Sequence, residues 1–169
     1  LIENIEWAFK VWREQPWGKN VPFSLFCEYI LPYRVGDERL VPWRKEIYER
    51  YNPLLDSIRK LPEAEDPRFV SEALFDSLRK APIHFTGQFE PSPHIGPKTV
   101  EWRSGSCKEF TDLLLYVYRA VGLPCAKDIM LMRGNRNAPH SWNVMFDKEG
   151  RGYYFTLLDN MTDGANPDA

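Results

Sequence analysis

The segment from residue 106 to residue 121 constrains the fold most, because its sequence marks both ends of a single helix. Ser106 and Glu109 form an S-x-x-E capping box at its start, and Gly122 with Pro124 marks its end. Between these signals the apolar residues follow the i, i+3, i+4, i+7 spacing of one buried face: Phe110, Leu113, Leu114, Val117 and Val121. The pattern predicts an amphipathic helix that packs against another element.

The sequence after this helix is typical of strands joined by turns. Residues 126–132, 140–146 and 152–158 form three β-prone runs, the last two joined by the turn 147–150. Residues 133–139 form the other turn. We therefore expect a small antiparallel sheet against the helix.

The first half of the chain is helical in pattern. Apolar spacing favours a helix near residues 2–12 and another over 67–80. Ser24 is the expected N-cap of a short helix ending at Leu31. A helix that begins near Pro42 is expected to kink or break at Pro53.

The order of these elements predicts the α+β class, with a helical first half and then one helix on a sheet. We divide the chain into a helical lead-in, 1–80, and a core, 81–163, which form one compact unit. Residues 164–169 are expected to be a linker or a truncated end. Residues 81–102, rich in proline and glycine, are expected to be a long ordered loop that borders the site.

Composition excludes several function classes. A net charge of −2 over 169 residues gives no reason to expect a nucleic-acid partner. The chain contains neither a run of about 18 apolar residues nor a visible signal peptide. Three cysteines and three scattered histidines match neither a disulfide scaffold nor a zinc pattern, so we expect no metal and no cofactor.

Cys107 stands in the position that thiol catalysis favours. As the first residue of the capped helix it lies among unpaired backbone amides, which favour a thiolate and can donate to an oxyanion. Cys27 and Cys125 lie in apolar surroundings, and we expect both to be buried structural thiols. From position alone, a small core residue is the simpler interpretation of Cys107.

His140 is the candidate base, although a structural histidine is the simpler reading of its position alone. Asp159 ends the next strand, so hairpin pairing is expected to bring it near His140, where a carboxylate orients the ring. Asp159 also fits a plain turn residue. Asp147 and Asp128 are rivals for the third role, and we favour Asp159.

Four pieces in order resemble the transglutaminase-like superfamily. They are Gly105-Ser106-Cys107-Lys108-Glu109, the helix end Arg119–Pro124, the strand start His140-Ser141-Trp142-Asn143-Val144, and the strand that runs from Gly152 to Asp159. The resemblance covers about residues 99–160. The gap from His140 to Asp159 is slightly long, and no Pro-Thr follows Asp159. The first half, around Phe26–Arg34, is similar to transglutaminase-like proteins of gut Bacteroidetes.

This resemblance implies a papain/transglutaminase-like core with a Cys107, His140 and Asp159 triad. It implies thiol-dependent acyl transfer on amide bonds of a peptide, protein or glycoconjugate, by a cysteine hydrolase (protease or amidase) or a transamidase. It also implies an exported protein, periplasmic or at the cell surface. The alternative is a non-catalytic module that binds peptide or glycan. Trp102, Gln88 and Trp142 are the candidates for the substrate wall or an oxyanion donor.

Overall fold

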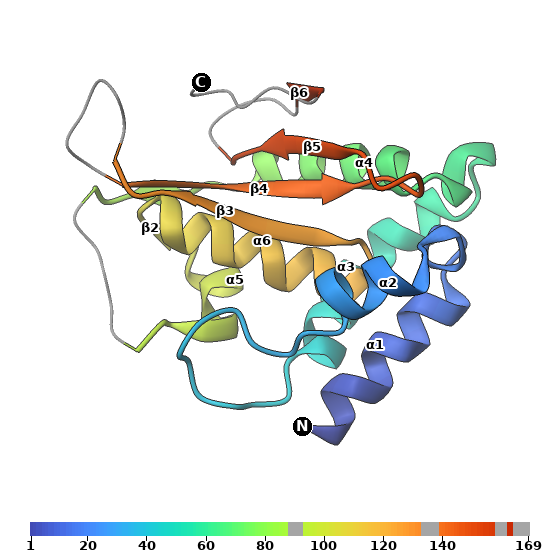
Figure 1. The fold of residues 1–169 in the computed structure, drawn as a ribbon, viewed down its shortest axis with the longest axis horizontal. Coiled ribbons are helices and arrows are strands. Elements are labelled where there is room, and N and C mark those ends of the chain that lie inside the picture. Colours follow the sequence, from blue (N-terminus) through green and yellow to red (C-terminus); the bar gives the residue numbers. More distant parts are fainter. Residues whose placement is uncertain (88–92, 133–138, 158–161, 164–169) are drawn as a thin grey trace.

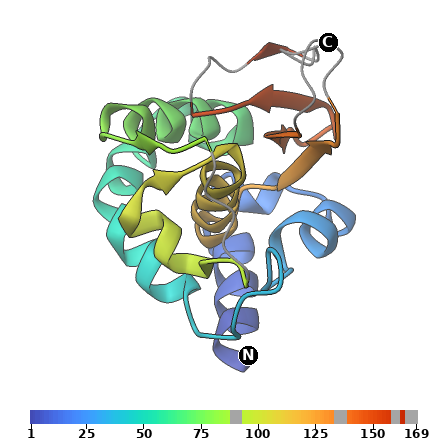
Figure 2. The ribbon, with the colours of Figure 1, turned by 90° about the vertical axis from the view of Figure 1, so that its left-hand side faces the viewer.

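Helix α6 (Cys107–Val121) runs through the centre of the protein in the computed structural model, which describes residues 1–87, 93–132, 139–157 and 162–163. Figure 2 shows this helix nearly end-on, with the large sheet on one side and helices of the first half around the others. Every residue from Glu109 to Val121 is buried. A central helix of this kind is apolar on most of its circumference, and its few buried polar side chains therefore require partners.

The sheet that covers α6 is antiparallel, in the order β3-β4-β5-β6 (Figure 1). Its strands are β3 (Cys125–Met130), β4 (His140–Phe146), β5 (Gly152–Phe155) and β6 (Thr162–Asp163). The pairing sets Met130 opposite His140 and Phe155 opposite Asn143. His140 is thus the first residue of a strand that has neighbours on both sides.

The remaining helices come from the first half and from the segment that leads into α6. Their bounds are α1 (Ile2–Glu14), α2 (Phe23–Leu25), a π-helical turn (Phe26–Ile30), α3 (Arg44–Ile58), α4 (Pro67–Lys80) and α5 (Thr99–Trp102), with 3-10 turns at Gly18–Asn20, Pro62–Glu65 and Gly96–Lys98. Helices α1, α3 and α5 contact α6 directly. Among the described residues, none of the helices combines the length and the apolar character that crossing a membrane requires.

The α+β class is confirmed, and so is the central prediction of a capped helix on a small antiparallel sheet. Both halves of the capping box between Ser106 and Glu109 are present. Gly122 ends the helix with φ 82°, a left-handed conformation that glycine adopts readily. The division into a lead-in, 1–80, and a core, 81–163, stays a prediction.

Three local predictions were wrong, and helix α3 does not break at Pro53, where a kink stays a prediction. The second helical segment starts at Phe23 after Pro22, so Ser24 is not its N-cap. Helix α3 continues through Pro53, because this proline lies on an exposed face where water can satisfy the carbonyl that loses its partner. Residues 81–102 are not one loop, since they contain α5 and the short strand β1 (His84–Phe85). The third strand stops at Phe155.

Candidate functional site

A pair of short parallel strands directly precedes the helix that begins at Cys107. Strand β1 pairs with β2 (Ser104–Gly105), which ends one residue before the N-cap of α6. Gly105 has φ 148°, and a Cβ at this position would lie 2.5 Å from the Cβ of Glu109. Only glycine therefore allows the Glu109 side chain to fold back onto Ser106.

Arg103 fixes the turn before β2. It has φ 48°, a left-handed conformation that is uncommon outside glycine. Its guanidinium donates hydrogen bonds to the carbonyl oxygens of Leu78, at 2.7 Å, and of Ala81 and Pro82. These bonds satisfy carbonyls at the end of α4 and tie that helix to the start of the candidate site.

The carboxylate of Glu109 completes the N-terminus of α6. Its Oε2 accepts hydrogen bonds from the backbone amide of Ser106, at 2.8 Å, and from the Ser106 hydroxyl, at 2.7 Å. The next residue, Cys107, is half-buried, and its amide belongs to the first-turn donors that lack an acceptor inside the helix. The sulfur therefore stands beside donors suited to a developing oxyanion.

Cys107 and His140 line the same pocket. The other residues that line it come from α6, from β4 and from the two residues that follow β5: Phe110, Thr111, Leu114, Ser141, Asn143, Thr156 and Leu157. The space open to the centre of a water molecule is about 10 Å³, which is at the lower limit for holding one water. The two residue types that thiol catalysis requires thus meet at a narrow, enclosed position.

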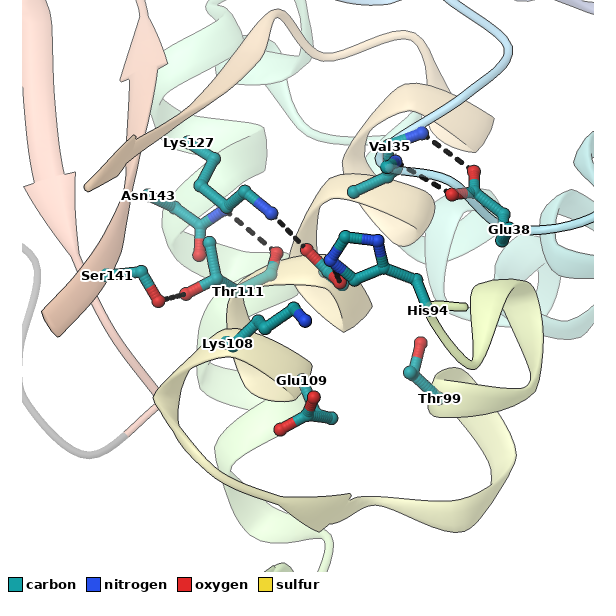
Figure 3. A network of polar contacts seen from close by, with 12 residues as sticks. Val35, Glu38, His94, Thr99, Lys108, Glu109, Thr111, Lys127, Ser141 and Asn143 are labelled. Atoms are coloured by element: carbon teal, nitrogen blue, oxygen red, sulfur yellow. Dashed lines mark hydrogen bonds and ion pairs between the residues drawn. The ribbon is translucent and has the colours of Figure 1, made fainter. Parts of the chain in front are cut away.

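Hydrogen bonds join the strand of His140 to the first turns of the Cys107 helix (Figure 3). The Thr111 hydroxyl donates to the Cys107 carbonyl and lies 3.1 Å from the Ser141 hydroxyl. The Asn143 amide donates to the Thr111 carbonyl at 3.1 Å. Both Ser141 and Asn143 are buried, and among the described residues the Asn143 Oδ1 has no hydrogen-bond partner.

An ion pair lies beside this contact, at the residue of α6 that follows Thr111. The Lys127 ammonium of β3 lies 2.7 Å from the carboxylate of Asp112, whose side chain is 3% exposed. The Nε2 of His94, a residue labelled in Figure 3, lies 3.9 Å from that carboxylate. Burial raises the pKa of Asp112, and the positive charge of Lys127 opposes that shift.

The other predicted site residues differ in their placement. Trp142 is buried, with its ring centroid 5.8 Å from that of His140, but it does not line the pocket. Trp102 is 60% exposed and does not line it either. Gln88 and Asp159 lie outside the described residues. The alternative third residue, Asp128 of β3, is exposed and lies opposite Trp142 of β4.

The expectation that residues 81–102 border the site holds only in part. None of their described members lines the Cys107 pocket. The segment does contact the residues next to it, because the Thr86 amide donates to the Gly105 carbonyl and the Phe85 ring stacks on Phe110. The segment therefore supports the N-terminus of α6 from outside.

The three thiols differ in access. Cys125 is fully buried, and burial raises its pKa to about 12. Cys27 is exposed, so the prediction that it is buried was wrong. In the π-helical turn Phe26 and Ile30 point into the core, and Cys27 faces outward. The described residues contain no group of three His, Cys, Asp or Glu side chains placed to hold a metal ion.

Sequence reasoning missed the polar residues between helix and sheet. Thr111, Ser141 and Asn143 had no assigned role, although the alternation in His140-Ser141-Trp142-Asn143 places two small polar residues on one face of a strand. A polar face toward an apolar helix implies specific partners. That signal, followed across the strand, leads to the hydrogen bonds with Thr111.

The fold and the pocket define a class: an α+β protein with a cysteine at a helix N-terminus and a histidine at the start of the adjacent central strand. Neither a family model nor a curated protein matches the chain. Among solved structures, the periplasmic domain of TgpA from Pseudomonas aeruginosa is similar, with 20% identity and a TM-score of 0.45 over 70% of this chain and 48% of that one. The same domain bound to ethylmercury gives 17% identity and a TM-score of 0.42 over 69% and 48%.

A candidate cysteine protease from Cytophaga hutchinsonii is also similar, with 15% identity and a TM-score of 0.47. The alignment covers 70% of this chain and 42% of that protein. The chain thus spans less than half the length of each of these structures.

Proposed function

We propose that this protein is a transglutaminase-like enzyme that performs thiol-dependent acyl transfer on amide bonds. In this mechanism the Cys107 thiolate attacks a carboxamide or peptide carbonyl and forms a tetrahedral oxyanion. The His140 imidazolium gives its proton to the leaving amine, which departs and leaves an acyl-thioenzyme. Water or an acceptor amine then attacks the thioester and loses a proton to His140. The C–S bond breaks, which releases the acyl product and restores the Cys107 thiolate.

One observation carries this proposal: Cys107, at the N-terminus of a capped helix, and His140, at the start of a central strand, line one pocket. The helix terminus favours a negative charge on sulfur and supplies amide donors toward an oxyanion. The Thr111–Ser141 contact ties the two elements together beside this pair, which favours a reproducible distance between thiol and imidazole.

Asp159 remains the proposed orienting carboxylate. Leu157, two residues earlier, lines the pocket with Cys107 and His140, so the chain reaches the correct end of the sheet. Asp128 is the weaker alternative, because an exposed carboxylate is solvated and holds an imidazole less firmly. Its strand pairs with β4, and it lies opposite Trp142 rather than His140.

A second candidate function is a non-catalytic module that binds a peptide or a glycan. The observation that favours it is the small size of the pocket, since about 10 Å³ leaves no room for an acyl group beside the sulfur. Under the enzymatic proposal the scissile group must bind at the mouth of this pocket. Substrate would then displace side chains that close it.

Thiol labelling tests the first step. The experiment uses a Cys27→Ser background, because Cys27 is exposed and reacts for reasons unrelated to the site. We expect a brief iodoacetamide pulse at pH 6 to label Cys107 and to spare the buried Cys125, as resolved by peptide mass mapping. His140→Gln should slow this labelling by about tenfold or more, whereas His84→Gln, at an exposed position outside the pocket, should not. Equal labelling rates of Cys107 in the two variants would contradict an interaction between the Cys107 thiol and the His140 imidazole.

A turnover assay distinguishes the reaction types. Dimethyl casein is incubated with a fluorescent primary amine to detect transamidation, in parallel with measurements of ammonia release and of new peptide ends. Cys107→Ser, which preserves the size of the side chain, is the matched control. Turnover that persists in Cys107→Ser would contradict thiol catalysis at Cys107. A complete absence of turnover together with intact peptide or glycan binding would favour the non-catalytic module.

The resemblance also carries the proposals of export and of membership in the transglutaminase-like superfamily. Expression of the full-length gene with fractionation of periplasm, cell surface and cytoplasm tests export directly. A purely cytoplasmic product would contradict it without affecting the assignment of Cys107.

A further inference from the structure

A second, larger cavity lies on the side of α6 that faces away from the sheet. Its lining residues come from the chain before α3, from α3 itself and from residues 95–101, which include most of α5. Figure 1 shows α3 and α5 on the side of α6 opposite the large sheet. The space open to the centre of a water molecule is about 350 Å³, which falls within the range of small-ligand pockets. None of its lining residues lines the Cys107 pocket.

The floor of this cavity is apolar and rigid. The ring of Trp43 packs edge-on against Tyr116, with centroids 4.9 Å apart, and its indole nitrogen donates to the Tyr33 carbonyl. Ile47 and Val100 are buried beside it. Such a floor loses little conformational entropy when an apolar group binds, because its side chains are already fixed.

One carboxylate in the wall is ionised but already bound by hydrogen-bond donors of the protein. Glu38 is 3% exposed and accepts hydrogen bonds from the Val35 and Gly36 amides and from the Tyr116 hydroxyl. Burial opposes its ionisation, but these donors outweigh it and lower the pKa of Glu38. The Glu38 carboxylate is therefore already bound within the protein, and we do not expect it to form hydrogen bonds with a ligand.

The exposed side chains of the rim include three cations and two carboxylates. Arg50 and Lys98 share the single carboxylate of Glu101, at 3.1 and 3.3 Å. Among the described residues, Arg39 and Glu46 have no hydrogen-bond or ion-pair partner, and both line the cavity. The three cations are balanced by these two exposed carboxylates and the buried Glu38. Among the described residues that line the cavity, Arg39 is thus the cation without a carboxylate partner.

We propose that this cavity binds a carboxylate with a compact apolar body, of the size of one or two amino-acid residues. The apolar body rests on Trp43, Ile47 and Val100, and the carboxylate accepts hydrogen bonds from Arg39 and from the Lys98–Arg50 side of the rim. Two sources offer this chemistry: a free organic acid and the C-terminal residue of a peptide. The proposal does not depend on catalysis at Cys107.

The test measures binding of N-acetyl-leucine and of its amide by NMR titration, with the Ile47 and Val100 backbone amides as local reporters. We expect the acid to shift both signals and to bind about tenfold or more tightly than the amide, because only the acid carries the charge. Ala-Ala-Ala-Leu with a free or an amidated C-terminus distinguishes the sources. A free peptide that binds at least as tightly as N-acetyl-leucine assigns the peptide end, and one that does not bind assigns the small acid.

Single charge changes at the rim complete the design. Arg39→Gln should weaken binding of the acid by about threefold, because Arg39 is exposed and its contribution is screened by water. Glu46→Gln is the matched control at the same rim and should leave the affinity unchanged or raise it by a similar factor. Unchanged circular dichroism is expected for both, because neither side chain makes a contact that the fold needs.

Three results would overturn the proposal. The first is equal affinity for acid and amide, which would reduce the cavity to an apolar cleft. The second is stronger binding of leucine amide, a cation, together with its loss in Glu46→Gln. The third is the absence of any shift at Ile47 and Val100 with all probes.

Discussion

Replacing Lys127 with methionine tests how much one buried charge between sheet and helix contributes to the free energy of unfolding. The ammonium of Lys127 lies 2.7 Å from the Asp112 carboxylate, and the two side chains are 13% and 3% exposed. Methionine keeps most of the stem of lysine and removes its charge. The substitution therefore leaves a buried carboxylate without its ammonium partner, with the His94 Nε2 at 3.9 Å.

The magnitude follows from the burial of the pair. Removing one partner of a buried ion pair costs about 3–5 kcal/mol, because the remaining charge is left desolvated. Some water reaches Lys127, so we expect the lower part of this range, about 3 kcal/mol. For a chain of this size that corresponds to a fall in Tm of about 6–12 °C.

The dependence on pH gives a sharper signature. The folded-state pKa of Asp112 is already raised by burial, and loss of the opposing Lys127 charge raises it further. A carboxyl group with a raised folded-state pKa binds its proton more tightly in the folded protein than in the unfolded chain. The free energy of unfolding therefore increases as the pH falls from the folded-state pKa toward the unfolded-state pKa. The variant should therefore lose more stability at pH 8 than at pH 5.

Urea unfolding followed by tryptophan fluorescence, at both pH values, measures these quantities. Lys45→Met is the matched control: Lys45 lies 4.0 Å from Glu49, is 53% exposed, and should contribute about 0–1 kcal/mol. The double variant Lys127→Met/Asp112→Leu should recover most of the loss, because it removes the stranded charge. The reasoning fails if Lys127→Met costs no more than Lys45→Met, or costs the same at pH 5 and pH 8.

Three further predictions concern the candidate site. Ser106→Ala should lower stability by about 1 kcal/mol in urea unfolding through loss of the cap, and an unchanged midpoint would contradict the capping box. Asp159→Asn should keep the fold and reduce thiol-dependent turnover by orders of magnitude; a fully active Asp159→Asn with an inactive Asp128→Asn would reassign the third residue. Thr111→Val should lower kcat more than it raises KM, with rescue by Thr111→Ser, because only a hydroxyl keeps the contact with Ser141; if Thr111→Ser is as impaired as Thr111→Val, the hydroxyl has no positioning role.

Local signals in the sequence were sufficient for the central helix. Ser106, Glu109 and Gly122 each act within one turn of α6, so their meaning does not depend on the rest of the fold. Helix α4 is bounded in the same way: the Asp66 carboxylate caps the Arg68 amide, and Pro67 follows as the first helical residue.

The features that sequence reasoning missed arise from tertiary contacts. The outward position of Cys27 depends on a π-helical turn, and a spacing pattern based on 3.6 residues per turn does not predict it. The continuity of α3 at Pro53 depends on which face of the helix meets water. The pair of Asp112 and Lys127 joins residues from different elements, although an aspartate inside an apolar helix already implies a buried partner.

Thr111, Ser141 and Asn143 form a polar seam between α6 and β4. This seam explains how the site can have a defined geometry inside an apolar core. Apolar contacts between a helix and a sheet are non-directional, so they tolerate small shifts of one element along the other. The hydrogen bonds from Ser141 and Asn143 to Thr111 are directional and buried, and a shift would leave their groups without partners at a cost of about 1–3 kcal/mol each. Because Thr111 lies one turn from Cys107, and Ser141 follows His140, these bonds act on the separation between thiol and imidazole. The proposed chemistry therefore depends on the polar residues of this seam as well as on the reacting pair.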